Sequence, residues 1–134
     1  MNTIDLLMGL DAEELAELPT KELKIVRLSK KAGADCIVKI KAIPPERFTE
    51  LTSGIRSKDG TLDTAEAYKA NVKVATAGMV NPPLTDASLM EHFGASTPGQ
   101  LIKKIFNGAE ISAIADEVTK LSGFDGNVIE EIKN

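Results

Sequence analysis

The 134-residue chain has few of the residues on which many enzymes and secreted scaffolds depend. It contains one cysteine, one histidine, one tyrosine and no tryptophan. The single cysteine, Cys36, cannot close an internal disulfide, which excludes a disulfide scaffold and fits a reducing compartment. No apolar run approaches the roughly 18 residues that span a bilayer, and the N-terminus lacks the basic start of a signal peptide. We therefore expect one compact domain located in the cytoplasm.

The sequence offers no cluster of residues typical of catalysis or metal binding. Cys36 and His92 lie far apart in the chain, and neither has the neighbours that a metal site or a Cys/His nucleophile pair requires. No lysine and hydroxyl follow the glycines at the spacing of a phosphate-binding loop. Acidic pairs such as Asp116-Glu117 are more typical of a solvated helix face than of a general acid and base. We predict a protein that is not an enzyme and needs neither a cofactor nor a metal.

Basic residues are missing from the first 18 positions, which carry five acidic ones, whereas residues 20–43 carry seven basic residues against two acidic ones. This pattern indicates that an acidic leader, residues 1–20, docks on the basic segment, either within one chain or between copies in a homo-oligomer. The alternative is that both are solvated surfaces, because exposed ion pairs contribute only ~0–1 kcal/mol each. The leader also carries a helix start, with an N-cap, a capping acid and a hydrophobic staple at Asp11, Glu14, Leu10 and Leu15.

The segment after the leader predicts a β-hairpin. Two stretches rich in β-branched and aliphatic residues, 22–28 and 36–43, are separated by a polar connection over 29–35. Lysines alternate with apolar residues in the second stretch, which predicts a strand with one solvent-exposed face and one face covered by other elements. An isolated hairpin is marginal in water, so we expect helices to pack on it.

From Pro44 onward the apolar period is helical. Three- and four-residue steps, bounded by proline or glycine, predict helices over 45–56, 62–79, 86–93, 98–106 and 109–121. The strongest start is Thr97-Pro98-Gly99-Gln100, an N-cap hydroxyl followed by proline and glutamine at the first and third helical positions. We predict an α+β fold, mostly α, in which residues 21–124 form one domain and residues 125–134 a loose tail.

The expected core consists of large apolar residues: Val38, Ile40, Phe48, Leu51, Tyr68, Val72, Leu101, Ile105, Ile114, Val118 and Leu121. A domain this small can leave apolar residues uncovered near its C-terminal end, where they can bind a protein partner. The candidates are Ile102, Phe106, Phe124, Val128, Ile129 and Ile132. The alternative is that they are core residues followed by a frayed end.

Nucleic-acid binding is the other function that the charge pattern raises. The hairpin is basic, and Asn107-Gly108 joins two predicted helices as in a helix-turn-helix. The second of these helices is acidic, however, with Glu110, Asp116 and Glu117 against Lys120, and phosphates would repel it. The hairpin also lacks aromatic side chains on which bases could stack. We therefore expect a protein partner, with neither nucleic acid nor membrane.

Several spaced motifs resemble the XkdN-like phage tail assembly chaperones. They are Arg27-Leu28-Ser29, Lys41-Ala42-Ile43, Ala77-Gly78-Met79-Val80-Asn81-Pro82, Thr97-Pro98 and Leu121-Ser122-Gly123-Phe124. The resemblance covers roughly residues 22–124 and leaves the leader outside. One departure lies at residues 108–111, where a contiguous glycine-glutamate-isoleucine is expected, and this departure puts the helix boundary in doubt.

The resemblance implies a non-enzymatic protein that binds the tape-measure protein in the cytoplasm of an infected or prophage-carrying bacterium and is absent from the finished particle. Contractile-tail phages and phage-tail-like bacteriocins both use such proteins. A long helical tape measure exposes apolar stripes that aggregate unless they are covered. A structural tail component remains the alternative within the same gene neighbourhood.

The family's chaperones often occur in two lengths, the longer one made by a ribosomal frameshift. Ile132-Lys133-Asn134 is compatible with a slippery heptamer if the codons are ATA, AAA and AAC or AAT. The resemblance therefore implies a frameshifted longer form of the chain as a further partner. An Ile132 codon other than ATA removes this site.

Overall fold

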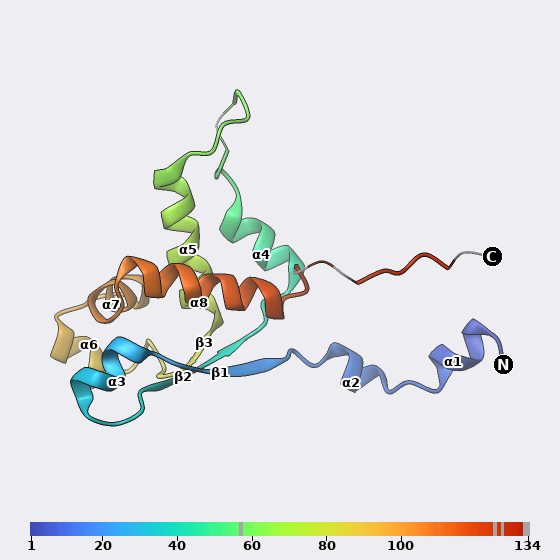
Figure 1. Ribbon diagram of the computed structural model, residues 1–134, viewed down its shortest axis with the longest axis horizontal. Coiled ribbons are helices and arrows are strands. Elements are labelled where there is room, and N and C mark those ends of the chain that lie inside the picture. Colours follow the sequence, from blue (N-terminus) through green and yellow to red (C-terminus); the bar gives the residue numbers. More distant parts are fainter. Residues whose placement is uncertain (57, 125, 127, 133–134) are drawn as a thin grey trace.

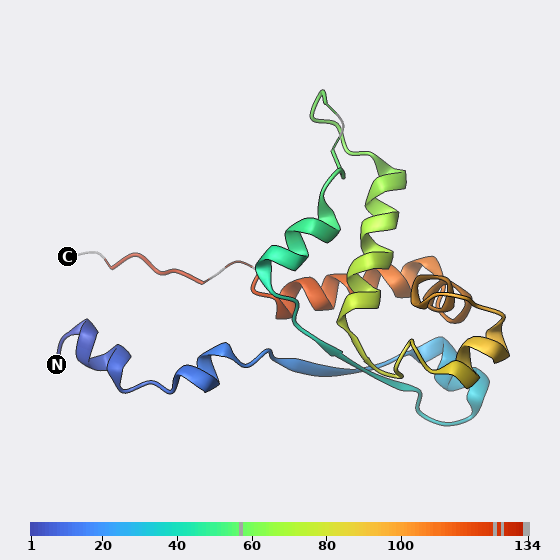
Figure 2. The ribbon, with the colours of Figure 1, turned by 180° about the vertical axis from the view of Figure 1, so that it is seen from behind.

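The computed structural model describes residues 1–56, 58–124, 126 and 128–132. It has an α+β fold, as the sequence predicts, with a small sheet, helices packed on it, and both chain ends projecting from the same side of the body (Figure 1, Figure 2). The helices within the described residues are α1 (Thr3–Met8), α2 (Ala12–Ala16), α3 (Val26–Ala32), α4 (Pro45–Thr52), α5 (Thr64–Gly78), α6 (Ala87–Phe93), α7 (Pro98–Ile105) and α8 (Gly108–Leu121). The strands are β1 (Thr20–Lys24), β2 (Ile37–Lys41) and β3 (Met79–Asn81).

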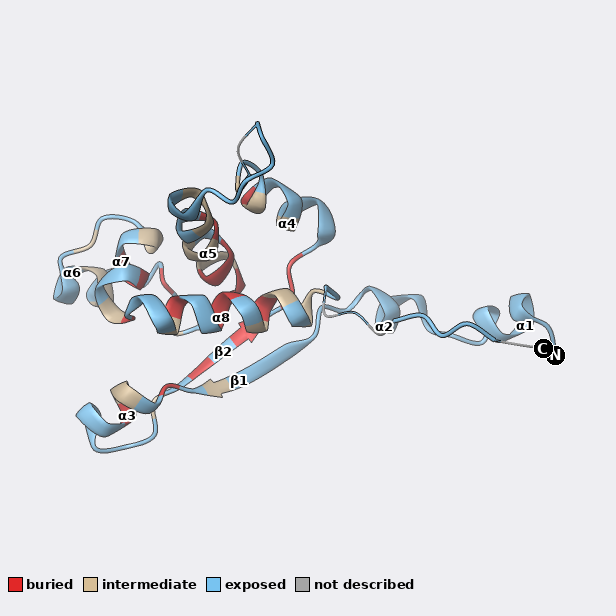
Figure 3. Cartoon of the chain, turned by 45° about the horizontal axis from the view of Figure 1, so that its top comes forward, coloured by how far each residue is buried: buried red, intermediate tan, exposed pale blue. Residues whose placement is uncertain are grey.

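The sheet is antiparallel in the order β1-β2-β3. Strands β1 and β2 pair from Thr20↔Lys41 to Lys24↔Ile37, which confirms that the two N-terminal stretches lie side by side. Val38 and Ile40 of β2 are buried against the helices, while the residues between them are exposed (Figure 3). The predicted solvent-exposed and covered faces of β2 are therefore confirmed. Strand β3 was not predicted from the sequence.

The connection between β1 and β2 is a helix, so the assignment of residues 26–28 to a strand is wrong. Within this helix the Ser29 Oγ donates to the Ile25 carbonyl at 2.8 Å and accepts from the Cys36 N–H at 2.8 Å. This buried hydroxyl joins the middle of α3 to the residue that precedes β2. Helix α3 ends at Gly33, whose φ of 73° is a left-handed conformation that favours glycine.

The leader contains two short helices, of which only the second was expected. Asn2 caps α1 in a capping box with Asp5, and Asp11 caps α2 by accepting from the Glu13 N–H. Every residue from 1 to 20 is exposed, and the leader extends away from the sheet (Figure 1). Within one chain the leader therefore does not dock on the basic segment, and only docking between copies stays a prediction.

The helices after Pro44 confirm the predicted succession. Side chains of Asp63, Asp86, Thr97 and Asn107 accept hydrogen bonds from the first turns of α5, α6, α7 and α8. The largest difference is in α4, which ends at Thr52 and not at residue 56. Polar side chains thus cap the starts of the last four helices.

The core largely follows the expected residues. Buried members are Val38, Ile40, Leu51, Leu101, Ile114 and Val118, and partly buried members packed on them are Phe48, Val72, Ile105 and Leu121. Tyr68 is 43% exposed, so its assignment to the core is wrong. The buried face of α5 is formed instead by Ala70, Val74, Ala75 and Gly78.

Candidate functional site

The described residues offer grooves and exposed apolar segments, and no metal cluster, as candidate sites. They contain no group of three or more histidine, cysteine, aspartate or glutamate side chains that could hold a metal ion. Among the same residues, no helix is long and apolar enough to cross a membrane. The candidate sites are therefore apolar grooves and exposed apolar segments.

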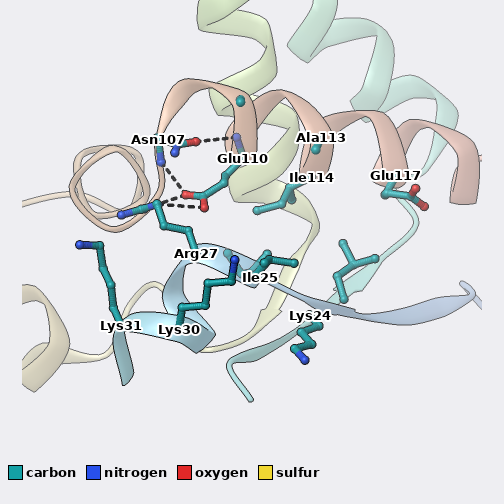
Figure 4. A pocket seen from close by; sticks show the side chains of 13 residues that line it. Lys24, Ile25, Arg27, Lys30, Lys31, Asn107, Glu110, Ala113, Ile114 and Glu117 are labelled. Carbon is teal, nitrogen blue, oxygen red and sulfur yellow. Dashed lines mark hydrogen bonds and ion pairs between the residues drawn. The ribbon is translucent and has the colours of Figure 1, made fainter. Parts of the chain in front are cut away.

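The larger groove lies between the β1–α3 segment and helix α8, and we call it the α3–α8 groove (Figure 4). Its volume is about 790 Å³, within the range of roughly 300–1,000 Å³ that ligand clefts occupy. Its apolar wall is formed by Leu23, Ile25, Val26, Ala113 and Ile114. The polar lining comes from Lys24, Arg27, Lys30, Lys31, Asn107, Glu110 and Glu117. The groove is thus apolar inside and charged at its edges.

One end of the groove is closed by a bidentate ion pair between Arg27 of α3 and Glu110 of α8 (Figure 4). Arg27 donates to the two carboxylate oxygens of Glu110 at 3.0 and 2.7 Å, and also to the carbonyl of Ile105 at 3.0 Å. Glu110 accepts in addition from the Asn107 N–H at 2.8 Å. The guanidinium of Arg27, followed by this backbone bond, lowers the pKa of Glu110 and keeps it ionised. The pair fixes α3 against the start of α8.

The rim of the groove is positively charged. Lys21 pairs with Glu117 at 2.7 Å and Lys24 with Asp35 at 3.1 Å, so these two charges are compensated within the chain. Lys30 and Lys31, in the last turn of α3, are exposed and form no ion pair with another described residue. The uncompensated charge at this rim is therefore basic.

A second, smaller groove of about 650 Å³ lies on the other side of α3, against α6 and α7. Leu28, Leu89, Phe93 and Phe106 line it, together with Cys36. His92 also lines this groove, with its ring edge-on to Phe93 at 4.8 Å. The lone cysteine and histidine of the chain thus both face an apolar surface.

The six expected partner residues separate into two groups. Phe124, Val128, Ile129 and Ile132 are exposed, and the ring of Phe124 stacks on Phe48 at 4.6 Å. Ile102 and Phe106 are 0% and 3% exposed, so the expectation that they lie uncovered is wrong. They continue the buried stripe of α7 that starts at Leu101, a spacing the sequence itself displays. Lys133 and Asn134, which belong to the expected frameshift site, lie outside the described residues.

Sequence reasoning missed the α3–α8 groove. Val26, Lys30 and Lys31 line the same side of the groove only because α3 is a helix, whereas the sequence predicts a strand and a polar connection for their segment. The available signal was the excess of basic residues over 20–43, which identified the charged rim but not its shape.

The motifs behind the family resemblance act as structural ties. Ser122 accepts from the Ile43 N–H at 2.9 Å and donates to the Val118 carbonyl at 2.7 Å, so it joins the end of α8 to the chain after β2. Asn107 and Glu110 form a reciprocal capping box around Gly108. The boundary left in doubt by residues 108–111 is therefore clear, with α8 beginning at Gly108.

Comparison with known proteins supports this architecture. No curated protein matches the chain significantly. A crystal structure of the protein yqbn is similar, with a TM-score of 0.55, 21% sequence identity, and coverage of 81% of this chain and 90% of that one. At this identity the likeness concerns the fold alone.

The family described as phage XkdN-like tail assembly chaperone protein matches residues 4–133. The match includes the leader, so the limit of 22–124 placed on the resemblance was too narrow. The chain belongs to the family of XkdN-like phage tail assembly chaperones.

Proposed function

We propose that the protein binds the tape-measure protein during tail assembly and is absent from the finished particle. The observation that supports this is the concentration of exposed apolar side chains in the projecting C-terminal segment, where Val128, Ile129 and Ile132 are 72%, 90% and 77% exposed. The exposure of such apolar side chains to water is unfavourable in free energy unless a partner covers them. A member of a tail chaperone family that displays them is suited to cover the apolar stripe of a client.

Phe124 is the natural anchor of this client surface. Its ring is half exposed and stacks on Phe48 of α4, which is itself partly buried against the core. An aromatic side chain held by the body but open to solvent on its other side can contribute to an interface at little further ordering cost. Apolar contacts beyond it would be supplied by Val128, Ile129 and Ile132.

The proposal places the protein in the cytoplasm of the bacterial host, where tails assemble, and gives it no catalytic step. It also includes the longer, frameshifted form of the chain, whose extension would continue from the exposed tail. Sequencing the gene tests that part: an Ile132 codon of ATA with an open −1 frame supports it, and any other Ile132 codon removes the site at residues 132–134.

Co-expression with the tape-measure protein of the same gene neighbourhood tests client binding. The client's soluble fraction should rise with the wild-type chain and fall again with a V128S/I129S/I132S variant. Leu62→Ser is the matched control, because Leu62 is also an exposed aliphatic residue but belongs to the loop before α5.

Two results would contradict the proposal. Equal client solubility with and without the protein would remove the chaperone role. Recovery of the chain in purified, finished particles would identify a structural tail component instead.

A further inference from the structure

Two charged features of the molecule form no ion pair among the described residues. Lys30 and Lys31 form no ion pair with other described residues at the rim of the α3–α8 groove. In the leader, Glu13, Glu14 and Glu17 are exposed and likewise form no ion pair with any residue that the structure describes. The two sets have opposite sign and similar size.

The same two regions also leave apolar surface uncovered. Val26, on the open side of the groove, is 58% exposed, beside the apolar wall formed by Ile25 and Ile114. Leu10 and Leu15 of the leader are 52% and 69% exposed. Acidic residues interspersed with leucines on short helices match a groove that is apolar inside and basic at its edge.

The path of the chain separates the leader from its own groove. The leader joins the start of β1 at Thr20, whereas the groove begins at Leu23 and Lys24 and continues into α3. From there the leader runs in the direction opposite to α3 (Figure 1, Figure 2). Docking on its own groove would require the chain to reverse at Pro19, while docking on a neighbouring molecule would not.

We propose that the α3–α8 groove binds the leader of a second copy of this chain. The acidic residues of α2 face Lys30 and Lys31, and leucines of the leader cover Val26 and the apolar wall. Helices as short as α1 and α2 are marginal alone in water, and docking would stabilise them. When each copy gives its leader to the other, the interface is closed and symmetric, and the product is a dimer.

Sedimentation of the purified protein at low and high salt tests this. The wild type should have twice the 14.3 kDa chain mass at low salt and dissociate as salt rises. The variants K30E/K31E and E13K/E14K/E17K should each weaken the dimer by about tenfold or more, because like charges then face each other.

Mixing the two variants distinguishes exchange between copies from a general loss of structure. In a mixed dimer, the basic leader of E13K/E14K/E17K meets the acidic groove rim of K30E/K31E, and the acidic leader of K30E/K31E meets the natural basic rim of E13K/E14K/E17K. Both contacts then join opposite charges, so the mixture should recover a mixed dimer. K103E/K104E is the matched control, because these adjacent lysines are also exposed in the last turn of a helix but lie outside the groove. V26D, at an exposed groove position, should also weaken the dimer even if the leader substitutions only unwind α2.

Several outcomes would overturn the proposal. A wild-type protein that is monomeric at every concentration would do so, including one whose leader docks on its own groove. A dimer that survives removal of residues 1–18, or variants that do not recover on mixing, would do so as well. Because no client is present, none of these results bears on binding of the tape-measure protein.

Discussion

Helices α1 and α8 start with the same local device but differ in what they contact. Asn2 and Asp5 form a capping box at α1, and Asn107 and Glu110 form one at α8. Helix α8 then runs for 14 residues and buries Ile111, Ile114, Ala115 and Val118, whereas α1 ends after six residues and buries none. A cap thus determines where a helix begins, but tertiary contact determines how much of it persists.

The acid at the third position shows the same difference. Among the bonds described, the Asp5 carboxylate accepts only from the Asn2 N–H, while the Glu110 carboxylate also accepts from the guanidinium of Arg27 on another helix. In α8 one side chain therefore serves both the local cap and the long-range packing. In the leader the cap belongs to a segment whose residues are all exposed.

Truncation of an apolar side chain gives the largest expected contrast between the leader and the body. Ile114→Ala should lower the free energy of unfolding by roughly 2–5 kcal/mol, because the side chain is 1% exposed in the core. Leu15→Ala, in the exposed leader, should change it by less than about 0.5 kcal/mol. Urea unfolding followed by circular dichroism measures both, and equal effects would show that the leader is part of the folding unit.

The helices and strands of the folded domain could be predicted wherever the sequence signal acts within a few residues of its own position. Thr97-Pro98-Gly99-Gln100 places the start of α7 at Pro98, where the structure has it, because a cap acts on its own first turn. Alternation in β2 likewise identified the covered positions Val38 and Ile40. These features require no knowledge of what lies across the core.

The remainder depends on contacts between distant segments. Helix α3 has no side-chain cap at Ile25, and the Cys36 N–H donates to the Ser29 Oγ only where the chain has turned back toward β2. Strand β3 has three residues, too few for a period to be visible. The α3–α8 groove lies between α3, which the sequence did not predict, and α8, which is about 80 residues away in sequence. Only the basic charge of the groove's rim could therefore be predicted.

Gly78→Ala tests the packing of α5 on α8, and we expect its effect on the free energy of unfolding to be of intermediate size. A Cβ at this position would lie 2.5 and 2.8 Å from the methyl carbons of Val118 and 3.2 Å from the Lys41 carbonyl oxygen. Helix propensity alone favours alanine over glycine by about 1 kcal/mol. We expect the opposite sign for Gly78→Ala, a loss of roughly 1–3 kcal/mol, because the added methyl overpacks the core.

Two comparisons check this explanation by thermal or urea unfolding. In a Val118→Ala background, Gly78→Ala should cost less than in the wild type, because the clashing methyl groups are gone. Gly99→Ala in α7 should be neutral or stabilising, since the nearest atom to its Cβ would be Val72 Cγ1 at 3.9 Å. A loss at Gly99 equal to that at Gly78 would contradict the packing argument.

The charge on Glu110 gives the smallest expected effect, and it depends on pH. Arg27 holds the pKa of Glu110 below its usual value of 4.5 in the folded protein. At a pH between the lowered pKa of the folded state and the usual pKa of the unfolded state, the unfolded state therefore binds more protons than the folded state. The contribution of the ion pair to stability is complete above about pH 4.5 and is lost as the pH falls through the lowered pKa. Glu110→Gln keeps an oxygen for the Asn107 N–H but removes the charge and one of the two oxygens that accept from Arg27. Its deficit in stability should be present at neutral pH and shrink in acid.

Asp5→Asn is the matched control for loss of charge at a capping acid, because it makes the same kind of change in α1, a helix that buries none of its residues. Asp86, whose own pKa is lowered chiefly by the Ser88 hydroxyl, makes the wild type lose further stability in acid. That loss is shared by both variants, so the difference between each variant and the wild type isolates the substituted acid. Urea unfolding from about pH 3 to pH 7 should show a pH-dependent difference between Glu110→Gln and the wild type, and at neutral pH a larger deficit for Glu110→Gln than for Asp5→Asn. A difference for Glu110→Gln that stayed constant over this range would mean that the side chain stabilises α8 through hydrogen bonding and shape, with no contribution from its charge.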